Sequence, residues 1–274
     1  MSTTTAAVVR SATSRRRIMA VFKRHFYVTI YSVPRMFDWL FWPVIDLMLW
    51  GFVTTFLAEQ NVALPTPVGF LIGGVLLWDL VFRSKNGIAL AFLEESWSRN
   101  VINILASPIT PTEYVAGAML WGLARMAMGW ATIVVLASAL FAFHVWHLGP
   151  VLALMAAALL VFGVSLSMIV LGLALRFGNQ ANILAWAISF MIMPFSAVFY
   201  PVSILPGWAQ AVASVLPTAH IFEAMRTVLA SKPTPRGHLE AAAVLDAVFL
   251  IVGFAYARAM FATLRRRGYV TRYM

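Results

Sequence analysis

Long apolar segments, separated by short polar and basic ones, follow one another along most of the 274-residue chain. A helix needs roughly 20 consecutive apolar residues to cross the roughly 30 Å hydrocarbon core of a bilayer. Segments of this kind predict six membrane-spanning helices, at residues 36–57, 68–91, 114–143, 151–175, 181–200 and 241–264. The pattern therefore predicts an all-α integral membrane protein.

The segment between the fifth and sixth predicted spans, residues 201–230, is broken by prolines into pieces too short to cross. One piece runs from Pro206 to Leu216 and opens with a proline, and the next runs from Thr218 to Ala230 and opens with a threonine cap. Such pieces reach only roughly 16 to 20 Å at about 1.5 Å per residue. Broken backbone at membrane depth must lie against protein or a water-filled cavity. We therefore predict a re-entrant helical hairpin, with Pro206 and Gly207 setting the turn into it.

The beginning of the chain is basic and weakly amphipathic. Small polar residues predict a disordered leader over residues 1–14. Residues 15–34 then place apolar side chains such as Val21 and Phe22 opposite Lys23 and Arg24, which is typical of a helix lying along the inner membrane surface. A flexible basic leader is the alternative interpretation of residues 15–34.

Composition and charge agree with a membrane protein. The chain is 62% hydrophobic and 11% charged, against about 25% charged residues in soluble domains. Its net charge of +10 does not indicate nucleic acid, because the basic residues cluster beside the spans. Most lie before the first span, after the second (with Lys85 counted among them), after the fourth or at the end. The positive-inside rule then places both termini in the cytoplasm, which requires an even number of crossings.

The loop after the second span, residues 94–110, is a second distinctive segment. Its charged start and apolar continuation to Leu105 predict a discrete amphipathic cytoplasmic helix suited to docking on a soluble partner. A merely solvated loop is the alternative. Thr110, Pro111 and Glu113 form the pattern of a capping box with proline at the first helical position, which predicts the start of the third span.

Signatures of catalysis and cofactor binding are missing from the sequence. It has no cysteine, no phosphate-binding loop of the Gly-x-x-x-x-Gly-Lys-Ser/Thr type and no His-Glu-x-x-His pattern. We expect no catalytic residue, cofactor or metal in this chain.

Several charged residues fall inside the predicted spans or hairpin. A charge at the centre of a bilayer costs about 2.5 to 3.5 kcal/mol, so such residues usually face a bundle interior or a cavity. The sequence leaves open whether they neutralise one another or line a path. The set comprises Asp46, Asp79, Arg83, Arg125, Glu223, Arg226 and Asp246.

The order of these parts resembles the type 2 permeases of ATP-binding-cassette exporters, over nearly the whole chain. The resemblance is carried by the interfacial helix, the charged segment after the second span, and a proline-rich hairpin before the last span. Within the hairpin, the motifs are Tyr200-Pro201-Val202-Ser203, Leu205-Pro206-Gly207-Trp208 and Leu216-Pro217 through Arg226. The resemblance implies a half-transporter in the cytoplasmic (inner) membrane. It implies that this half-transporter forms a homodimer on two copies of a separate ATPase, which binds the ATP.

The resemblance also implies roles for particular residues. Positions that match the ATPase-coupling helix of the family are Glu94, Glu95, Trp97, Arg99 and Asn100. Positions that match the hairpin closing the outer end of the path are Pro201, Pro206, Gly207, Trp208, Pro217, Glu223 and Arg226. Family substrates include lipid-linked polysaccharides, lipo-oligosaccharides, hydrophobic drugs and teichoic-acid-type polymers, among which the sequence does not select.

Two other functional classes remain open from the residues alone. Asp46 or Asp79 would titrate in an ion-coupled secondary carrier, although the chain shows no evident internal repeat of the kind such carriers often have. A membrane-embedded transferase is disfavoured by the lack of an acidic metal-binding cluster.

Overall fold

The computed structural model describes residues 3–59, 69–97, 100–142, 149–230, 232–233 and 235–267. Within these ranges the protein is helical and contains no strand. The helices are α1 (Thr3–Ile30), α2 (Val33–Glu59), α3 (Gly69–Trp97), α4 (Val101–Ala106), α5 (Pro111–Phe141), α6 (Val151–Phe177), α7 (Ala181–Phe195), α8 (Gly207–Ser214), α9 (Pro217–Leu229) and α10 (Arg236–Arg267). Short 3-10 turns at Gly178–Gln180 and Val202–Ile204 join some of them.

Four of these helices are long and apolar enough to cross a membrane, which confirms the predicted class of protein. They are Val33–Glu59, Thr112–Phe141, Val151–Phe177 and Arg236–Thr263. The 29-residue helix α3 is as long, but Asp79, Arg83 and Lys85 interrupt its apolar character. The fifth predicted span differs, because α7 ends at Phe195 rather than at Tyr200. The chain turns two residues later at Ala197, whose φ of 54° is left-handed and incompatible with a continuing helix.

Helix α6 lies at the centre of the bundle and packs most extensively against α10 and α3. Glycines make the closest approaches. A Cβ atom on Gly253 of α10 would lie 2.6 Å from the Ser165 carbonyl oxygen of α6, and one on Gly172 would lie 2.5 Å from the Tyr256 ring. Small residues at such crossings are typical of membrane helix packing, because they let two backbones approach.

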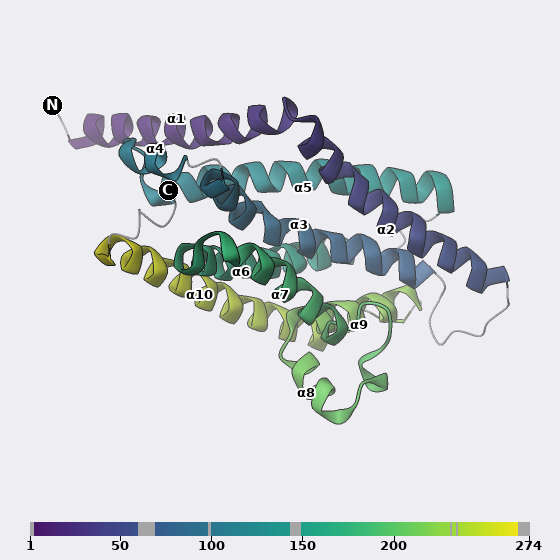
Figure 1. Cartoon of the computed structure of the whole chain (residues 1–274). Helices are drawn as coiled ribbons and strands as arrows, with labels where there is room; N and C mark the ends of the chain where they lie inside the picture. Colours follow the sequence, from purple (N-terminus) through teal and green to yellow (C-terminus); the bar gives the residue numbers. More distant parts are fainter. Residues whose placement is uncertain are drawn as a thin grey trace.

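Helix α1 packs along the start of α5, where Gly117 leaves room for the buried Val21. Its backbone is helical from Thr3, so the prediction of a disordered leader is wrong for residues 3–14. No glycine or proline interrupts the chain between Thr3 and Ile30 that would end the helix earlier. Figure 1 shows the start of α1, the short α4 and the end of α10 at one end of the bundle, with α8 displaced well away from that end.

Replacing Gly253 by alanine should destabilise the bundle by about 1–3 kcal/mol, because the new methyl group meets backbone that cannot rotate away. The matched control is Gly237→Ala at the start of α10, where nothing lies within 4 Å of the added carbon. Thermal unfolding of the purified variants in detergent measures both effects. Equal melting temperatures for the two variants would contradict this account of the α6–α10 contact.

Candidate functional site

The predicted coupling segment is divided between two helices. Helix α3 continues to Trp97, whereas α4 covers only Val101–Ala106, so the prediction of one discrete helix from Glu94 to Leu105 is wrong. The break falls at Asn100, whose backbone N–H donates to the Glu95 carbonyl at 2.9 Å and closes the end of α3. Arg99 and the side chain of Trp97 lie outside the described residues.

Glu95 is the centre of this corner, and it faces inward. The residue is only 3% exposed. Arg24 of α1 donates from Nε and Nη2 to the two carboxylate oxygens of Glu95, at 2.8 and 2.6 Å. The amide of Asn100 donates to the same carboxylate at 2.8 Å. A bidentate arginine–carboxylate pair fixes orientation as well as distance. Glu95, at the end of α3, is therefore bonded both to α1 and to Asn100, the residue that precedes α4.

His25 completes this arrangement, which we call the Glu95 clamp (Arg24, His25, Glu95 and Asn100). The imidazole is buried, with Nε2 4.0 Å from a Glu95 oxygen and its ring edge-on to Tyr114. Burial lowers the pKa of His25 to about 4, although Glu95 opposes the shift. The imidazole is therefore neutral at pH 7, and the charge of Glu95 is balanced by Arg24.

The remaining coupling residues lie nearer the surface. Glu94 has an oxygen 3.9 Å from Arg35 at the start of α2. Beyond Asn100, α4 exposes Asn103 and Ala106. Within the described part of this segment, α4 thus offers exposed side chains, whereas Glu95 is used inside the chain.

The capping box before α5 is confirmed. The Thr110 hydroxyl accepts from the Glu113 backbone N–H at 3.2 Å, and the Glu113 carboxylate accepts from the Thr110 N–H at 2.9 Å. Pro111 occupies the first turn as predicted.

The hairpin residues form two short helices, but the second begins differently from the prediction. Helix α9 starts at Pro217, and Leu216 rather than Thr218 is its N-cap. The proline holds the preceding residue extended, at φ −99° and ψ 122°, and itself suits the first helical position. Thr218 is fully buried, and its hydroxyl bonds to that of Ser196 at 2.7 Å. It therefore ties α9 to the end of α7.

Glu223 and Arg226 hold the elbow that follows α7. Arg226 donates to the Ala197 carbonyl at 2.8 Å, at the residue with left-handed φ. Glu223 accepts from the Val202 backbone N–H at 2.7 Å, and its carboxylate lies 3.0 Å from the Arg226 guanidinium. The Phe70 ring of α3 lies 4.7 Å from the guanidinium on its other side. Both charges thus neutralise each other and satisfy backbone groups that no helix can satisfy.

The prolines and the glycine of the hairpin have unequal roles. Pro201 and Pro206 are the extended residues before the Val202–Ile204 turn and α8. Gly207 has an ordinary φ, and nothing lies within 4 Å of an added Cβ atom, so the prediction that Gly207 sets the turn is wrong. Trp208 is 67% exposed and packs edge-on against the Phe195 ring.

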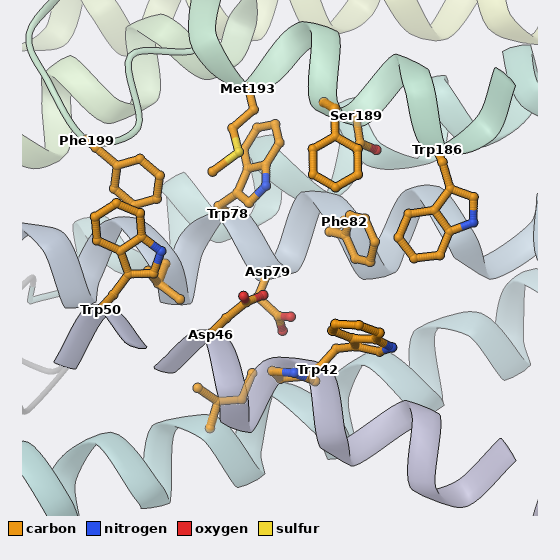
Figure 2. Close-up of a pocket in the computed structure, with 14 residues that line it drawn as sticks. Trp42, Asp46, Trp50, Trp78, Asp79, Phe82, Trp186, Ser189, Met193 and Phe199 are labelled. Carbon is orange, nitrogen blue, oxygen red and sulfur yellow. The ribbon is translucent and has the colours of Figure 1, made fainter. Parts of the chain in front are cut away.

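A cavity of about 290 Å³, which we call the aromatic chamber, lies between α2, α3 and α7. Figure 2 shows Asp46 of α2 and Asp79 of α3 pointing toward each other, with aromatic rings around them. The principal rings are Trp42, Trp50, Trp78, Phe82, Trp186 and Phe199. A smaller cavity of about 100 Å³ adjoins it and is lined in addition by Arg83 and Arg125. The four sequence-predicted charges, Asp46, Asp79, Arg83 and Arg125, are therefore brought together.

Within this group, Arg83 donates from Nε to Asp79 at 2.5 Å, one turn away on α3. Lys85 is a further buried charge on α3, and the charge pattern of the sequence does not single it out because it groups Lys85 with the cytoplasmic basic residues. It is 2% exposed and donates to the Ala185 carbonyl at 2.9 Å and the Ser189 hydroxyl at 2.5 Å, both on α7. The only available signal was its position inside the predicted second span.

The long apolar helices, the charges satisfied between them and the short helices α8 and α9 define a multi-pass helical membrane protein. A model of the ABC-2 type transporter family matches residues 6–230, and the chain therefore belongs to that family. This confirms the resemblance seen in the sequence. The family's members are generally non-catalytic permeases that work with a separate ATPase subunit. A search of curated proteins gives no match.

Replacing Glu95 by alanine should release α1 from the bundle. The variant removes the charged hydrogen bonds that Arg24 donates. We assign them about 1.5 kcal/mol, the lower end of the range for bonds to charged groups, because the side chain of Arg24 is 43% exposed. Trypsin cleavage between Arg15 and Arg24 should become about tenfold faster. Glu94→Ala is the matched control and should change the rate less than twofold. Similar rates for both variants would show that Glu95 does not hold α1.

Replacing Arg226 by methionine should lower the free energy of unfolding by about 1–3 kcal/mol, because it leaves the Ala197 carbonyl and the Glu223 carboxylate without their partner. Gly207→Ala in the same hairpin should change it by less than about 0.5 kcal/mol. Thermal unfolding in detergent compares the two. A larger loss for Gly207→Ala would restore the original assignment of the turn to Gly207.

Proposed function

We propose that this chain is the permease subunit of an ATP-binding-cassette exporter, and that two copies form the translocation path on two copies of a separate ATPase. In this arrangement α2, α3, α5, α6, α7 and α10 cross the cytoplasmic membrane, and α8 and α9 form a re-entrant hairpin on the outer side. Both chain termini are then cytoplasmic. The substrate is lipid-linked, saccharide or hydrophobic and drug-like.

The observation that carries this proposal is the continuity of α3. Its middle contributes Trp78 and Asp79 to the aromatic chamber, and its end contributes Glu95 to the clamp beside α4. Asp79 and Glu95 are sixteen positions apart, which corresponds to about 24 Å of unbroken helix. A force applied to α4 therefore reaches the chamber through a rigid element.

The way in which their polar groups are satisfied supports the proposal that α3 and α7 each cross the membrane. Asp79 pairs with Arg83, and Lys85 donates to α7, so the charges in the middle of α3 are compensated inside the protein. Helix α7 is short, and its broken continuation is covered by α9 through Arg226. Helical continuity can be lost at membrane depth where protein covers the backbone.

The arrangement of the two ends supports the predicted orientation. The start of α1, the helix α4 and the end of α10 lie at the same end of the bundle (Figure 1). This end carries the basic residues Arg15, Arg16 and Arg17 and the clamp. The positive-inside rule assigns such an end to the cytoplasm, where a nucleotide-binding partner is located.

Replacing the exposed Ala106 of α4 by arginine should reduce transport-coupled ATP hydrolysis at least fivefold. Arginine keeps the propensity of this helix and suits its C-terminal end, so the variant adds bulk and charge without unfolding α4. Ala211→Arg, on the exposed surface of the distant helix α8, is the control and should stay within twofold. The assay uses the permease reconstituted with its cassette ATPase.

Equal effects of the two substitutions would remove α4 as the docking helix. Transport that continued without ATP and followed the proton gradient would instead favour the ion-coupled carrier.

A further inference from the structure

We propose that the aromatic chamber binds small organic cations that carry apolar groups, with the positive charge held at Asp46. The inference rests on the proposed function and deepens it, because it assigns a substrate class to the permease.

The walls are rich in aromatic faces. Four of the ten tryptophans of the chain line this one cavity: Trp42, Trp50, Trp78 and Trp186. They come from three helices, and Figure 2 shows them arranged around the two carboxylates. Tryptophan has the aromatic face that attracts cations most strongly, and desolvation increases that attraction. A ligand cation in the chamber would thus meet rings from several sides.

The charges of the chamber are one-sided. Among the residues that the structure describes, Asp46 and Asp79 are the charged ones in its lining, whereas Arg83 and Arg125 line the smaller adjoining cavity, which both aspartates also line. Arg83 is bonded to Asp79. Asp46 forms no ion pair or hydrogen bond with any residue that the structure describes. Asp46 is also exposed in the single chain, so a ligand can reach it.

The buried cation Lys85 does not compensate Asp46. Lys85 lies behind the wall formed by Ser189, and its ammonium group donates to that hydroxyl and to the Ala185 carbonyl. An uncompensated carboxylate is costly at membrane depth. A ligand that brings a positive charge would remove that cost, whereas an anion would add to it.

The volume limits the ligand to a small molecule. A cavity of about 290 Å³ lies at the lower end of the range for small-molecule sites. It accommodates a substituted ammonium group with one ring. Stacking of a neutral sugar ring on the same tryptophans is the competing possibility, and it does not use the charge of Asp46.

Equilibrium binding of radiolabelled benzyltrimethylammonium to the purified full chain in lipid nanodiscs tests the proposal without nucleotide. We expect saturable binding of the labelled cation. Its neutral carbon isostere, neopentylbenzene, should compete at least tenfold more weakly than the unlabelled cation. Asp46→Asn should weaken binding of the cation about tenfold. Asp246→Asn is the matched control, because Asp246 is a buried carboxylate on α10 outside the chamber, and it should change affinity less than twofold.

A second pair of variants decides the question if Asp46→Asn does not fold. Trp186→Phe keeps an aromatic face and should retain most of the affinity, whereas Trp186→Leu keeps only apolar bulk and should lose at least fivefold. Equal affinities for these two variants would overturn the cation–ring contact.

Three further results would overturn the inference: no saturable binding of the cation, equal competition by the neutral isostere, or equal effects of the Asp46 and Asp246 substitutions. Displacement of the cation by methyl glucoside at a similar concentration would assign the chamber to neutral sugars instead. The outcome is separable from the proposed function. Intact ATPase coupling without cation binding contradicts only this inference. Cation binding by a chain whose reconstituted transport does not depend on a cassette ATPase contradicts only the proposed function.

Discussion

The charged side chains of helix α3 are satisfied inside the protein, and several long-range contacts of the structure follow from this constraint. Asp79, Arg83, Lys85 and Glu95 follow one another along a helix that α5 and α6 flank. Each has a partner in the protein: a neighbour on α3, backbone and hydroxyl groups of α7, or Arg24 of α1. These contacts attach α1 and α7 to α3, whose main packing neighbours are α6 and α5.

The hairpin follows the same rule with backbone groups in place of side chains. Where α7 stops, the Ala197 carbonyl and the Val202 N–H lose their helical partners. Arg226 and Glu223 of α9 replace them. A single helix thus covers the polar backbone of the elbow, and the pair is electrically neutral. This explains how irregular backbone is accommodated beside the apolar bundle.

The two candidate sites are connected because they share one helix. The Glu95 clamp joins α1 and the approach to α4 at one end of α3, and the aromatic chamber lies along its middle. In the proposed exporter, a movement of the docked ATPase has to reach the path, and α3 supplies that connection. The chamber has its aromatic and acidic groups on α2, α3 and α7, so a shift of α3 changes its shape directly.

Local rules of sequence were sufficient for the class of protein, most helix positions and the capping box of Thr110 and Glu113. Apolar length and capping depend on neighbouring residues, and both can be read along the chain. The same rules located the proline breaks of the hairpin, but they assigned Thr218 to a cap although its hydroxyl bonds to Ser196 of α7.

The direction in which each charge faces was decided only by the tertiary structure. Glu95 belongs to a segment that resembles a docking surface, yet Arg24, 71 positions away in the chain, draws it inside. Lys85 is of a residue type typical of exposed loops, but its partners lie on α7, 100 and 104 positions further along the chain. The sequence by itself determined that these charges exist in a membrane protein. Helix packing decided which of them pair and which, like Asp46, remain open to a ligand. The reason is that pairing depends on contacts between helices that are far apart in the chain.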